Sequence, residues 1–230
     1  MNIVVLTGAG ISAESGVKTF RGQDGLWEGH AIEEVATPEA FQRNPALVYQ
    51  FYNQRRAQLL DSQIKPNPGH KALAQLEKAF PEQTTVVTQN VDNLHERAGN
   101  KNIIHMHGEL QKARCLKTGE SFLWTDDLNE TSTHPKGLNS QLRPDIVWFG
   151  EVPKELERIE KLLFDCDLFL CVGTSGQVYP AAGFVQLVKK SCQTIEFNLE
   201  STGISSNFDQ TIIGPSGETL TQWVQEFLNE

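Results

Sequence analysis

The feature that most constrains the fold is an alternation between short apolar runs and longer amphipathic stretches. Apolar runs of strand length occur at residues 2–7, 84–89, 102–107, 145–149, 167–173 and 193–198. Helical patterns occupy residues 44–60, 69–80, 153–164, 181–191 and 216–230. Near-continuous apolar strands that alternate with helices are typical of a parallel sheet covered on both faces. The pattern therefore predicts an α/β fold.

Residues 111–141 interrupt this alternation, because they are polar, rich in turn residues and without a clear period. We expect them to form an inserted small lobe together with the helical region 22–60. The sheet part would comprise about 1–21, 61–110 and 142–230. A chain of 230 residues suits one such domain with an inserted lobe.

Composition limits the classes of partner. The net charge of −9 argues against a protein that holds nucleic acid through bulk charge. The longest strongly apolar run, 168–173, is too short to cross a membrane, and residues 1–10 are typical of a first strand and not of a signal peptide. We expect a monomer, because the surface is acidic and no association seam is visible.

Cysteine usage bears on the compartment. The four cysteines are Cys115, Cys166, Cys171 and Cys192. The last three lie in or beside apolar patterns, which favours buried, reduced thiols. The expected location is therefore the cytoplasm.

The first predicted strand runs into a glycine-rich turn, TGAGISAESGVKTFRG. Gly8, Gly10 and Ala13 match the spacing of a dinucleotide-binding turn, in which glycines let the backbone approach a pyrophosphate. A tight strand-to-helix turn is the alternative, but the motif follows a strand and opens a helix. Glu28 lies where a dehydrogenase carries its ribose-binding acid, yet its surroundings are not a strand. The turn thus predicts a dinucleotide but gives no support to hydride transfer.

Polar residues also follow other predicted strands. Gln89, Asn90 and Asp92 come at the carboxyl end of one strand, where open α/β sheets bind ligands. Helix capping is the alternative interpretation for Asp92. His107 ends the next strand, where a histidine acts either as a general base or as a structural residue. A second glycine- and hydroxyl-rich loop occupies 173–183.

Together these motifs resemble the sirtuins, a family of NAD-dependent protein lysine deacylases, and among them the bacterial CobB type. The matching segments are GAGISAESGVKTFRG, TQNVDNLHERAG, HMHGEL, RPDIVWFGE, GTSGQVYPAAG and FNLE. They occur in the family's order and cover almost the whole chain. The resemblance implies a Rossmann-like parallel sheet with helices on both faces and an inserted small lobe with a helical part and a zinc-ribbon part. NAD and acyl-lysine would meet in the cleft between them.

The resemblance also implies residue roles. The residues expected to bind NAD are Gly8, Ala9, Gly10, Ser12, Phe20, Arg21, Gln89, Asn90, Asp92, Gly173, Thr174, Ser175, Asn198 and Leu199. The residues expected in catalysis are His107, Asn90 and Asp92. The residues expected to bind the acyl-lysine are Ala36, Tyr52, Arg55, Val147, Phe149, Gly150, Glu151 and Val178.

In the implied reaction, the acyl oxygen attacks the ribose carbon that bears nicotinamide, and nicotinamide leaves. His107 then takes a proton from a ribose hydroxyl, which requires a neutral imidazole. The products are free lysine and O-acyl-ADP-ribose. Water must be excluded, because it would hydrolyse the reactive intermediate. Trp148, Phe149 and the loop after Phe20 are the residues expected to exclude it.

Two residues of the helical region bear on which acyl group is removed. Tyr52 and Arg55 are three positions apart on a predicted helix and therefore share a face. On composition alone, Tyr52 would pack in the core of the lobe, with Arg55 and Arg56 on a solvated face. The resemblance instead implies that Tyr52 and Arg55 bind the acyl group, because sirtuins that remove succinyl groups carry Tyr-x-x-Arg here. They also carry a small residue, matched by Ala36, that widens the tunnel. The resemblance implies removal of succinyl as well as acetyl groups.

Most sirtuins carry four zinc-binding cysteines in the small lobe. Cys115 matches the first, but Thr118 replaces its partner and residues 130–137 contain no cysteine. His134 adds one ligand at most, and two ligands do not make a structural zinc site. We therefore expect no zinc, and we expect an apolar cluster in its place. Its members would be Leu116, Phe122, Leu123, Trp124 and Leu128.

Two alternative functions share this scaffold, a protein ADP-ribosyltransferase and a non-catalytic NAD-binding module. The presence of His107, Asn90 and Asp92 argues against the non-catalytic module. An acyl-lysine tunnel formed by VWFGE and Val178 favours the deacylase over the transferase. The expected partners are acylated lysine side chains of proteins, with no nucleic acid and no membrane.

Overall fold

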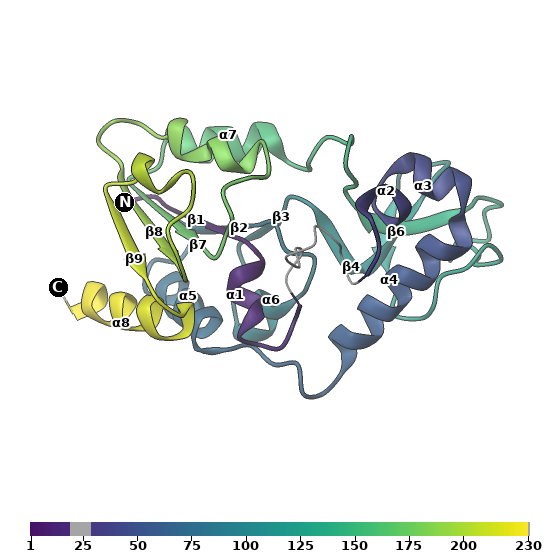
Figure 1. Ribbon diagram of the computed structural model, residues 1–230, viewed down its shortest axis with the longest axis horizontal. Helices are drawn as coiled ribbons and strands as arrows, with labels where there is room; N and C mark the ends of the chain where they lie inside the picture. The colour runs from purple at the N-terminus through teal and green to yellow at the C-terminus, as the bar shows by residue number, and fades with distance from the viewer. Residues whose placement is uncertain (19–28, 230) are drawn as a thin grey trace. The chain divides into compact units, whose positions relative to one another are not determined.

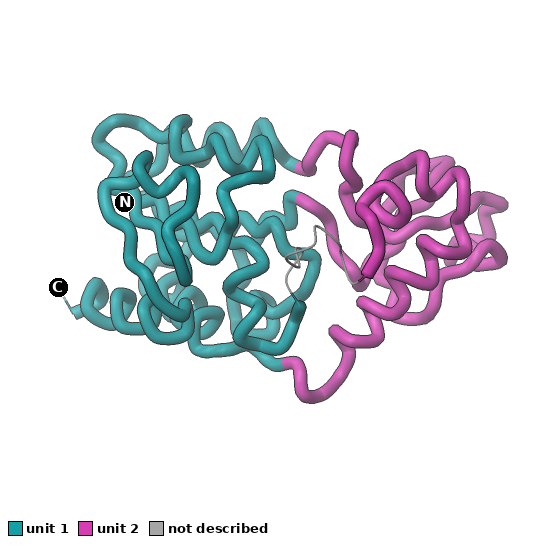
Figure 2. Tube along the Cα trace, in the orientation of Figure 1, with its two compact units in different colours: residues 1–19, 65–106, 155–230 teal, residues 20–64, 107–154 magenta. Residues whose placement is uncertain are grey.

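The computed structural model describes residues 1–18 and 29–229. The chain divides into two compact units (Figure 2). Unit 1 comprises Met1–Thr19, Lys65–Met106 and Glu155–Glu230, and unit 2 comprises Phe20–Ile64 and His107–Lys154. Phe20 and Arg21, both expected to bind NAD, lie outside the described residues. Within those residues, none of the helices has the length and hydropathy that a membrane crossing requires.

Unit 1 contains a six-stranded parallel sheet in the order β3-β2-β1-β7-β8-β9. The strands are β1 (Ile3–Thr7), β2 (Thr84–Thr88), β3 (Ile103–His105), β7 (Leu168–Val172), β8 (Gln193–Asn198) and β9 (Gln210–Ile213). All but β9 lie within apolar runs that predicted strands. β9 escaped prediction because it is a short edge strand with no buried residue. The strand order reverses between β1 and β7, as in a doubly wound sheet, and the expected Rossmann-like α/β fold is confirmed.

Helices cover both faces of this sheet (Figure 1). The helical elements of unit 1 are α1 (Ala9–Ala13), α5 (Pro68–Ala79), α6 (Leu94–Ala98), α7 (Leu156–Phe164), η1 (Ala181–Gln186), η2 (Ser205–Asn207) and α8 (Ser216–Asn229). Because successive strand residues point to opposite faces, Val5 of β1 packs in one core with Leu73 of α5 and Leu220 of α8. Leu6 packs in the other core with Leu163 of α7. The helix expected over 181–191 is only the short 3₁₀ helix η1.

Unit 2 combines helices with a three-stranded antiparallel sheet in the order β5-β4-β6. The helices are α2 (Ile32–Val35), α3 (Pro38–Arg43) and α4 (Pro45–Leu60), and the strands are β4 (Gly108–Cys115), β5 (Ser121–Leu123) and β6 (Leu142–Ile146). The sequence did not predict this sheet, because residues 111–141 show no period and the strand expected at 145–149 overlaps only the end of β6. Residues 142–154, which we expected in the sheet part, belong to unit 2 because β6 pairs with β4.

The apolar cluster expected in place of zinc is only partly present. Leu116 and Leu123 are 49% and 71% exposed, whereas Leu128 is buried. The ring of Phe122 contacts both Trp124 and His134, with centroids 6.2 and 5.0 Å apart. The two exposed leucines therefore contribute little, and a small aromatic group takes their place.

Buried polar contacts hold the remainder of this region. Arg56 of α4 is 1% exposed and donates to Leu110 O at 2.8 Å and Asp126 O at 3.2 Å. Asn53, one turn earlier, accepts from Arg56 Nη1 and Leu128 N and donates to Leu128 O. The expectation that Arg56 lies on a solvated face is therefore wrong, because its guanidinium satisfies carbonyls of β4 and of the loop that follows β5.

Candidate active site

The loops that follow β1 and β7 meet at the point where the strand order reverses. Gly8 N donates to Val172 O at 3.0 Å, and Gly10 N donates to Gly173 O at 2.8 Å. A Cβ atom at Gly8 would lie 2.7 Å from Gly173 O, and one at Gly10 would lie 2.7 Å from Gly173 Cα. Neither position accepts a side chain unless the loops move. This glycine cradle (Gly8, Gly10 and Gly173) occupies the crevice where doubly wound sheets bind nucleotides.

A buried cluster of polar side chains lies beside the cradle. Ser12 Oγ donates to Asp92 Oδ2 at 2.9 Å. Asn90 Nδ2 donates to Gly8 O at 3.0 Å and to Ser12 Oγ at 3.1 Å. Burial raises the pKa of Asp92, although hydrogen bonds from Leu94 N and Ser12 partly oppose this. The carboxyl group also accepts from Leu94 N, the first residue of α6, at 3.0 Å, although the N-cap position of that helix is Asn93.

The loops after β2, β7 and β8 are joined through Thr174. Gln89 Nε2 donates to Thr174 Oγ1 at 3.0 Å, and Asn198 Nδ2 donates to Thr174 O at 2.7 Å. Ser175 and Leu199 are exposed on the same loops, and Ala9 and Val178 are half-buried. The structure thus brings together the expected nucleotide-binding residues that belong to unit 1.

Two histidines that sequence reasoning did not assign to the site complete the buried cluster. His95 Nε2 lies 3.0 Å from Thr7 Oγ1, and His70 Nε2 lies 3.5 Å from Ser12 Oγ. Their ring centroids are 5.0 Å apart. Burial lowers the pKa of His95 to about 3 and that of His70 to about 4. Both imidazoles are therefore neutral at pH 7. The only sequence signal for His70 is its place in the first turn of α5, after the cap residue Asn67.

We expect the free energy of unfolding to fall as the pH drops from about 6.5 toward 4. In this window the unfolded chain protonates both histidines at their ordinary pKa of about 6.5, whereas the folded chain keeps them neutral. The unfolded state then binds more protons, so stability falls as the pH falls, by at most about 1.4 kcal/mol per pH unit for each histidine.

Urea unfolding at several pH values measures this slope. His70→Gln and His95→Gln should each reduce the slope, whatever they do to stability at pH 7. Variants whose stability depends on pH as steeply as the wild type would contradict the assignment.

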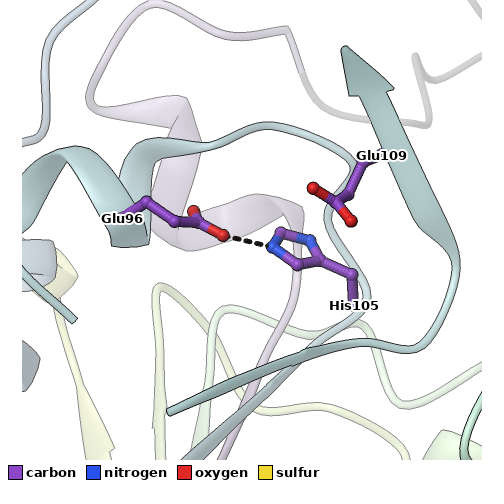
Figure 3. Close-up of side chains that lie close together, drawn as sticks. All are labelled: Glu96, His105 and Glu109. Atoms are coloured by element: carbon purple, nitrogen blue, oxygen red, sulfur yellow. Dashed lines mark hydrogen bonds and ion pairs between the residues drawn. The ribbon is translucent and has the colours of Figure 1, made fainter. Parts of the chain in front are cut away.

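The two histidines at the end of β3 and just beyond it, His105 and His107, differ in their surroundings. His105 Nε2 lies 2.6 Å from Glu96 Oε1 of α6 (Figure 3). Burial acts to raise the pKa of Glu96, but the hydrogen bond from His105 outweighs it and the pKa is lowered. His107 begins unit 2, where its side chain is half-buried and its backbone O accepts from Val147 N at 2.9 Å. Since His105 is held in an ion pair, His107 is the candidate base.

Residues expected to line the acyl pocket come together in unit 2. Trp148 Nε1 donates to Tyr52 Oη at 3.0 Å, and Phe149 N donates to Ala36 O at 3.0 Å. The Tyr52 side chain is fully buried, which raises its pKa and keeps the phenol protonated. Because an indole N–H can only donate, the Tyr52 proton is directed away from Trp148. Tyr52 therefore lies in the core of unit 2, as composition alone suggested, and also beside the expected pocket residues.

Arg55 occupies a different environment from its neighbour Arg56. Its guanidinium carbon lies 4.4 Å from the centroid of the Phe51 ring, and the residue is half-buried. This cation–π contact restricts the guanidinium. Arg55 is thus a partly desolvated cation one turn of helix away from Tyr52.

Glu151, which we expected at the acyl-lysine site, is bound to neighbouring residues of unit 2. Its carboxylate accepts from Arg143 Nη1 at 2.7 Å and Nη2 at 2.8 Å, and from Trp148 N at 2.9 Å. Burial opposes ionisation of Glu151, but the hydrogen bonds from Arg143 and Trp148 lower its pKa. Arg143 also stacks 3.4 Å above the Trp148 ring. The carboxylate therefore holds Trp148 in place, whereas Phe149 and Gly150 beside it are exposed.

The residues around Cys115 do not fit a structural zinc ion. Cys115 Sγ donates to Ser140 Oγ at 3.2 Å. His134 is buried against Phe122, and its Nδ1 accepts from Lys136 N at 3.1 Å. One thiol and one imidazole with a nitrogen already occupied do not provide a tetrahedral ligand set.

We therefore expect purified protein to contain no stoichiometric zinc. Chelation should change neither the melting temperature nor the activity, because Arg56, Asn53 and the His134–Phe122 contact hold the region without metal. Elemental analysis and thermal melts with and without chelator measure this. About one zinc per chain would contradict the ligand assignment.

A doubly wound sheet with a glycine cradle and an amide–carboxylate cluster at its switch point defines a dinucleotide-binding protein. The model of the Sir2 family matches residues 8–180. An NAD-dependent protein deacylase of Pasteurella multocida is 54% identical, over 99% of this chain and 98% of that protein. One of Bdellovibrio bacteriovorus is 55% identical, over 99% and 97%. The chain belongs to the Sir2 family, as the motifs predicted.

Solved structures agree with this assignment. A complex of a Sir2 homologue with NAD has a TM-score of 0.88 and 38% identity, over 99% of this chain and 90% of that one. A Sir2 complex with a p53 peptide and NAD⁺ has a TM-score of 0.81 and 28% identity, over 100% and 94%. These structures share the fold described above and include bound NAD or peptide.

Proposed function

We propose that this chain is an NAD-dependent protein lysine deacylase. The observation that carries the proposal is the glycine cradle with its Ser12–Asn90–Asp92 cluster at the switch point of a Sir2-family chain. The name of the curated relatives, NAD-dependent protein deacylase, supports it. So does the presence of NAD and a peptide in related solved structures.

The side chains of unit 1 fit a dinucleotide. Gly8 and Gly10 leave only backbone at the crevice, which suits a pyrophosphate. Asn90 and Asp92 would bind the ribose and nicotinamide half. The residues assigned to the adenosine half are Gly173, Thr174, Ser175, Asn198 and Leu199. Ala9, Gln89, Phe20 and Arg21 stay part of the proposal through the family resemblance. When bound, NAD supplies the electrophilic ribose carbon that accepts the acyl oxygen.

Unit 2 supplies the base and the acyl pocket. His107 takes the proton of a ribose hydroxyl through an imidazole nitrogen, which raises the nucleophilicity of that oxygen. Trp148 and Phe149 exclude water, and Trp148 is held by Glu151, Arg143 and Tyr52. Val147 and Gly150 would contact the substrate chain, which would pair in an extended conformation, and Val178 of unit 1 is proposed to contact it as well.

Acyl choice would be set by Arg55 with Tyr52 and Ala36. A guanidinium can bind a carboxylate through two parallel hydrogen bonds, and a protonated phenol can add a third donor. We assign removal of succinyl as well as acetyl groups on this basis. The net charge of −9 supports a protein substrate without nucleic acid, and we propose that the enzyme acts as a cytoplasmic monomer.

One assay tests the proposal against its alternatives. The protein is incubated with labelled NAD and an acetyl or succinyl peptide, and nicotinamide, peptide mass and label on protein are measured. A deacylase releases one nicotinamide per acyl group lost. Label transfer to protein without loss of acyl mass would instead indicate an ADP-ribosyltransferase. No turnover of NAD would indicate a binding module.

A further inference from the structure

A carboxylate that the proposed mechanism does not use lies inside unit 1. Glu196 of β8 is fully buried. It accepts from Thr202 Oγ1 at 2.8 Å, from Ser205 Oγ through a short hydrogen bond, and from Thr211 Oγ1 at 3.4 Å. A buried carboxylate requires such donors. Two of the three come from the loop 199–207 that directly follows β8.

This loop is organised around the same two hydroxyl groups. Ser205 Oγ accepts from Thr202 N at 2.7 Å, and Thr202 Oγ1 accepts from Ile204 N at 3.3 Å. The side chain of Ile204 rests on Gly176, where an added Cβ would lie 2.5 Å from Ile204 Cγ1. Glu196 thereby fixes the loop 199–207 against the loop that follows β7.

The loop after β7 and the loop 199–207 both begin at the carboxyl ends of their strands, where the glycine cradle also lies. Thr174 of the loop after β7 and Asn198, the last residue of β8, are joined there by a hydrogen bond of 2.7 Å. Asn198 is two residues beyond Glu196 on the same strand. A shift of the loop 199–207 would therefore move the polar groups assigned to the adenosine half of the cofactor.

We infer that Glu196 is a positioning residue for nucleotide binding, which acts through Thr202 and Ser205 on the loops that hold the adenosine half of NAD. This inference rests on the proposed NAD site. Glu196 itself is enclosed and does not touch the ligand. Its loss would weaken the binding of adenosine diphosphoribosyl compounds and leave the acyl-transfer step unchanged.

Glu196→Gln tests the inference, because the amide keeps the shape but replaces one acceptor oxygen by a donor and removes the charge. The Kd for ADP-ribose, measured by calorimetry, should rise about tenfold. The KM for NAD should rise by a similar factor, while kcat at saturating NAD stays within about twofold.

Glu77→Gln is a matched control. Glu77 is another buried carboxylate of unit 1, which accepts from Asn100 Nδ2 at 2.7 Å and from Lys101 N and Asn102 N. It fixes the loop before β3, at the amino ends of the parallel strands, whereas the cradle lies at their carboxyl ends. This variant should lower the melting temperature but leave the Kd for ADP-ribose unchanged.

The outcomes are distinct. An unchanged Kd in Glu196→Gln, or an equal rise in Glu77→Gln, would overturn the inference. If Glu196→Gln does not fold, the double variant Thr202→Val/Ser205→Ala removes the donors, and it should show the same rise in Kd or else refute the role. Wild-type protein that binds no ADP-ribose would contradict the proposed function itself.

Discussion

Replacing His107 by alanine is expected to abolish NAD-dependent deacylation, leaving no more than a few per cent of wild-type turnover. Loss of a general base typically lowers a rate by about 10²–10⁴-fold. The fold should survive, because the backbone O of His107 accepts from Val147 N in any variant. Nicotinamide release and peptide mass measure activity, and a thermal melt checks the fold.

His105→Gln is the matched control, because His105 is two residues away and is bound to Glu96. This variant should retain most of its activity and lose only the contribution of that ion pair to stability. Turnover above a few per cent in folded His107→Ala would remove His107 from its role. Equal inactivity of both variants would show that the segment, and not the individual imidazole, is what matters.

Replacing Arg55 by methionine should lower kcat/KM for a succinyl peptide by at least about tenfold, with a much smaller change for the acetyl peptide. A desolvated hydrogen bond to a charged group contributes about 1.5–3 kcal/mol, which corresponds to roughly ten- to a hundredfold in rate. Methionine keeps an unbranched apolar side chain but lacks the guanidinium that stacks on the Phe51 ring. The two peptides are compared under the same NAD concentration.

Arg56→Met is the control for this experiment. Arg56 is the neighbouring arginine, but its guanidinium donates to Leu110 O and Asp126 O inside unit 2. Its loss leaves buried carbonyls without a donor, so stability should fall and both peptides should be affected alike. Equal losses on both peptides in Arg55→Met would show that Arg55 supports the fold or the NAD site and does not select the acyl group.

Much of unit 1 was predictable because its signals are local. A strand that is buried on both faces appears in the sequence as a continuous apolar run. A backbone position with no room for a Cβ atom requires glycine, and that glycine is visible in the sequence. Hence β1, β2, β7 and β8 and the turn at Gly8 and Gly10 were visible in the sequence. The motifs, in their order along the chain, also identified the family, and several of them lie at the carboxyl ends of parallel strands, where ligands bind.

Unit 2 was less predictable because it depends on pairing between distant segments. β4 and β6 lie more than twenty residues apart along the chain, and only the end of β6 falls within an apolar run that predicted a strand. The absence of a zinc ligand set was visible from the missing cysteines. The contacts that hold this region without zinc were not visible. A buried arginine such as Arg56 resembles a surface arginine until the carbonyls that it satisfies are known.

The sequence by itself therefore determined the parallel sheet, the glycine cradle and the family, because local composition reports burial and backbone constraint. Only the tertiary structure decided which polar side chains act together. His70 and His95 join the Ser12 and Thr7 hydroxyls, and Glu196 holds Thr202 and Ser205, through hydrogen bonds that chain folding brings within 3.5 Å. The physical reason is that a hydrogen bond depends on distance and direction in space, which the spacing of residues along a chain does not encode.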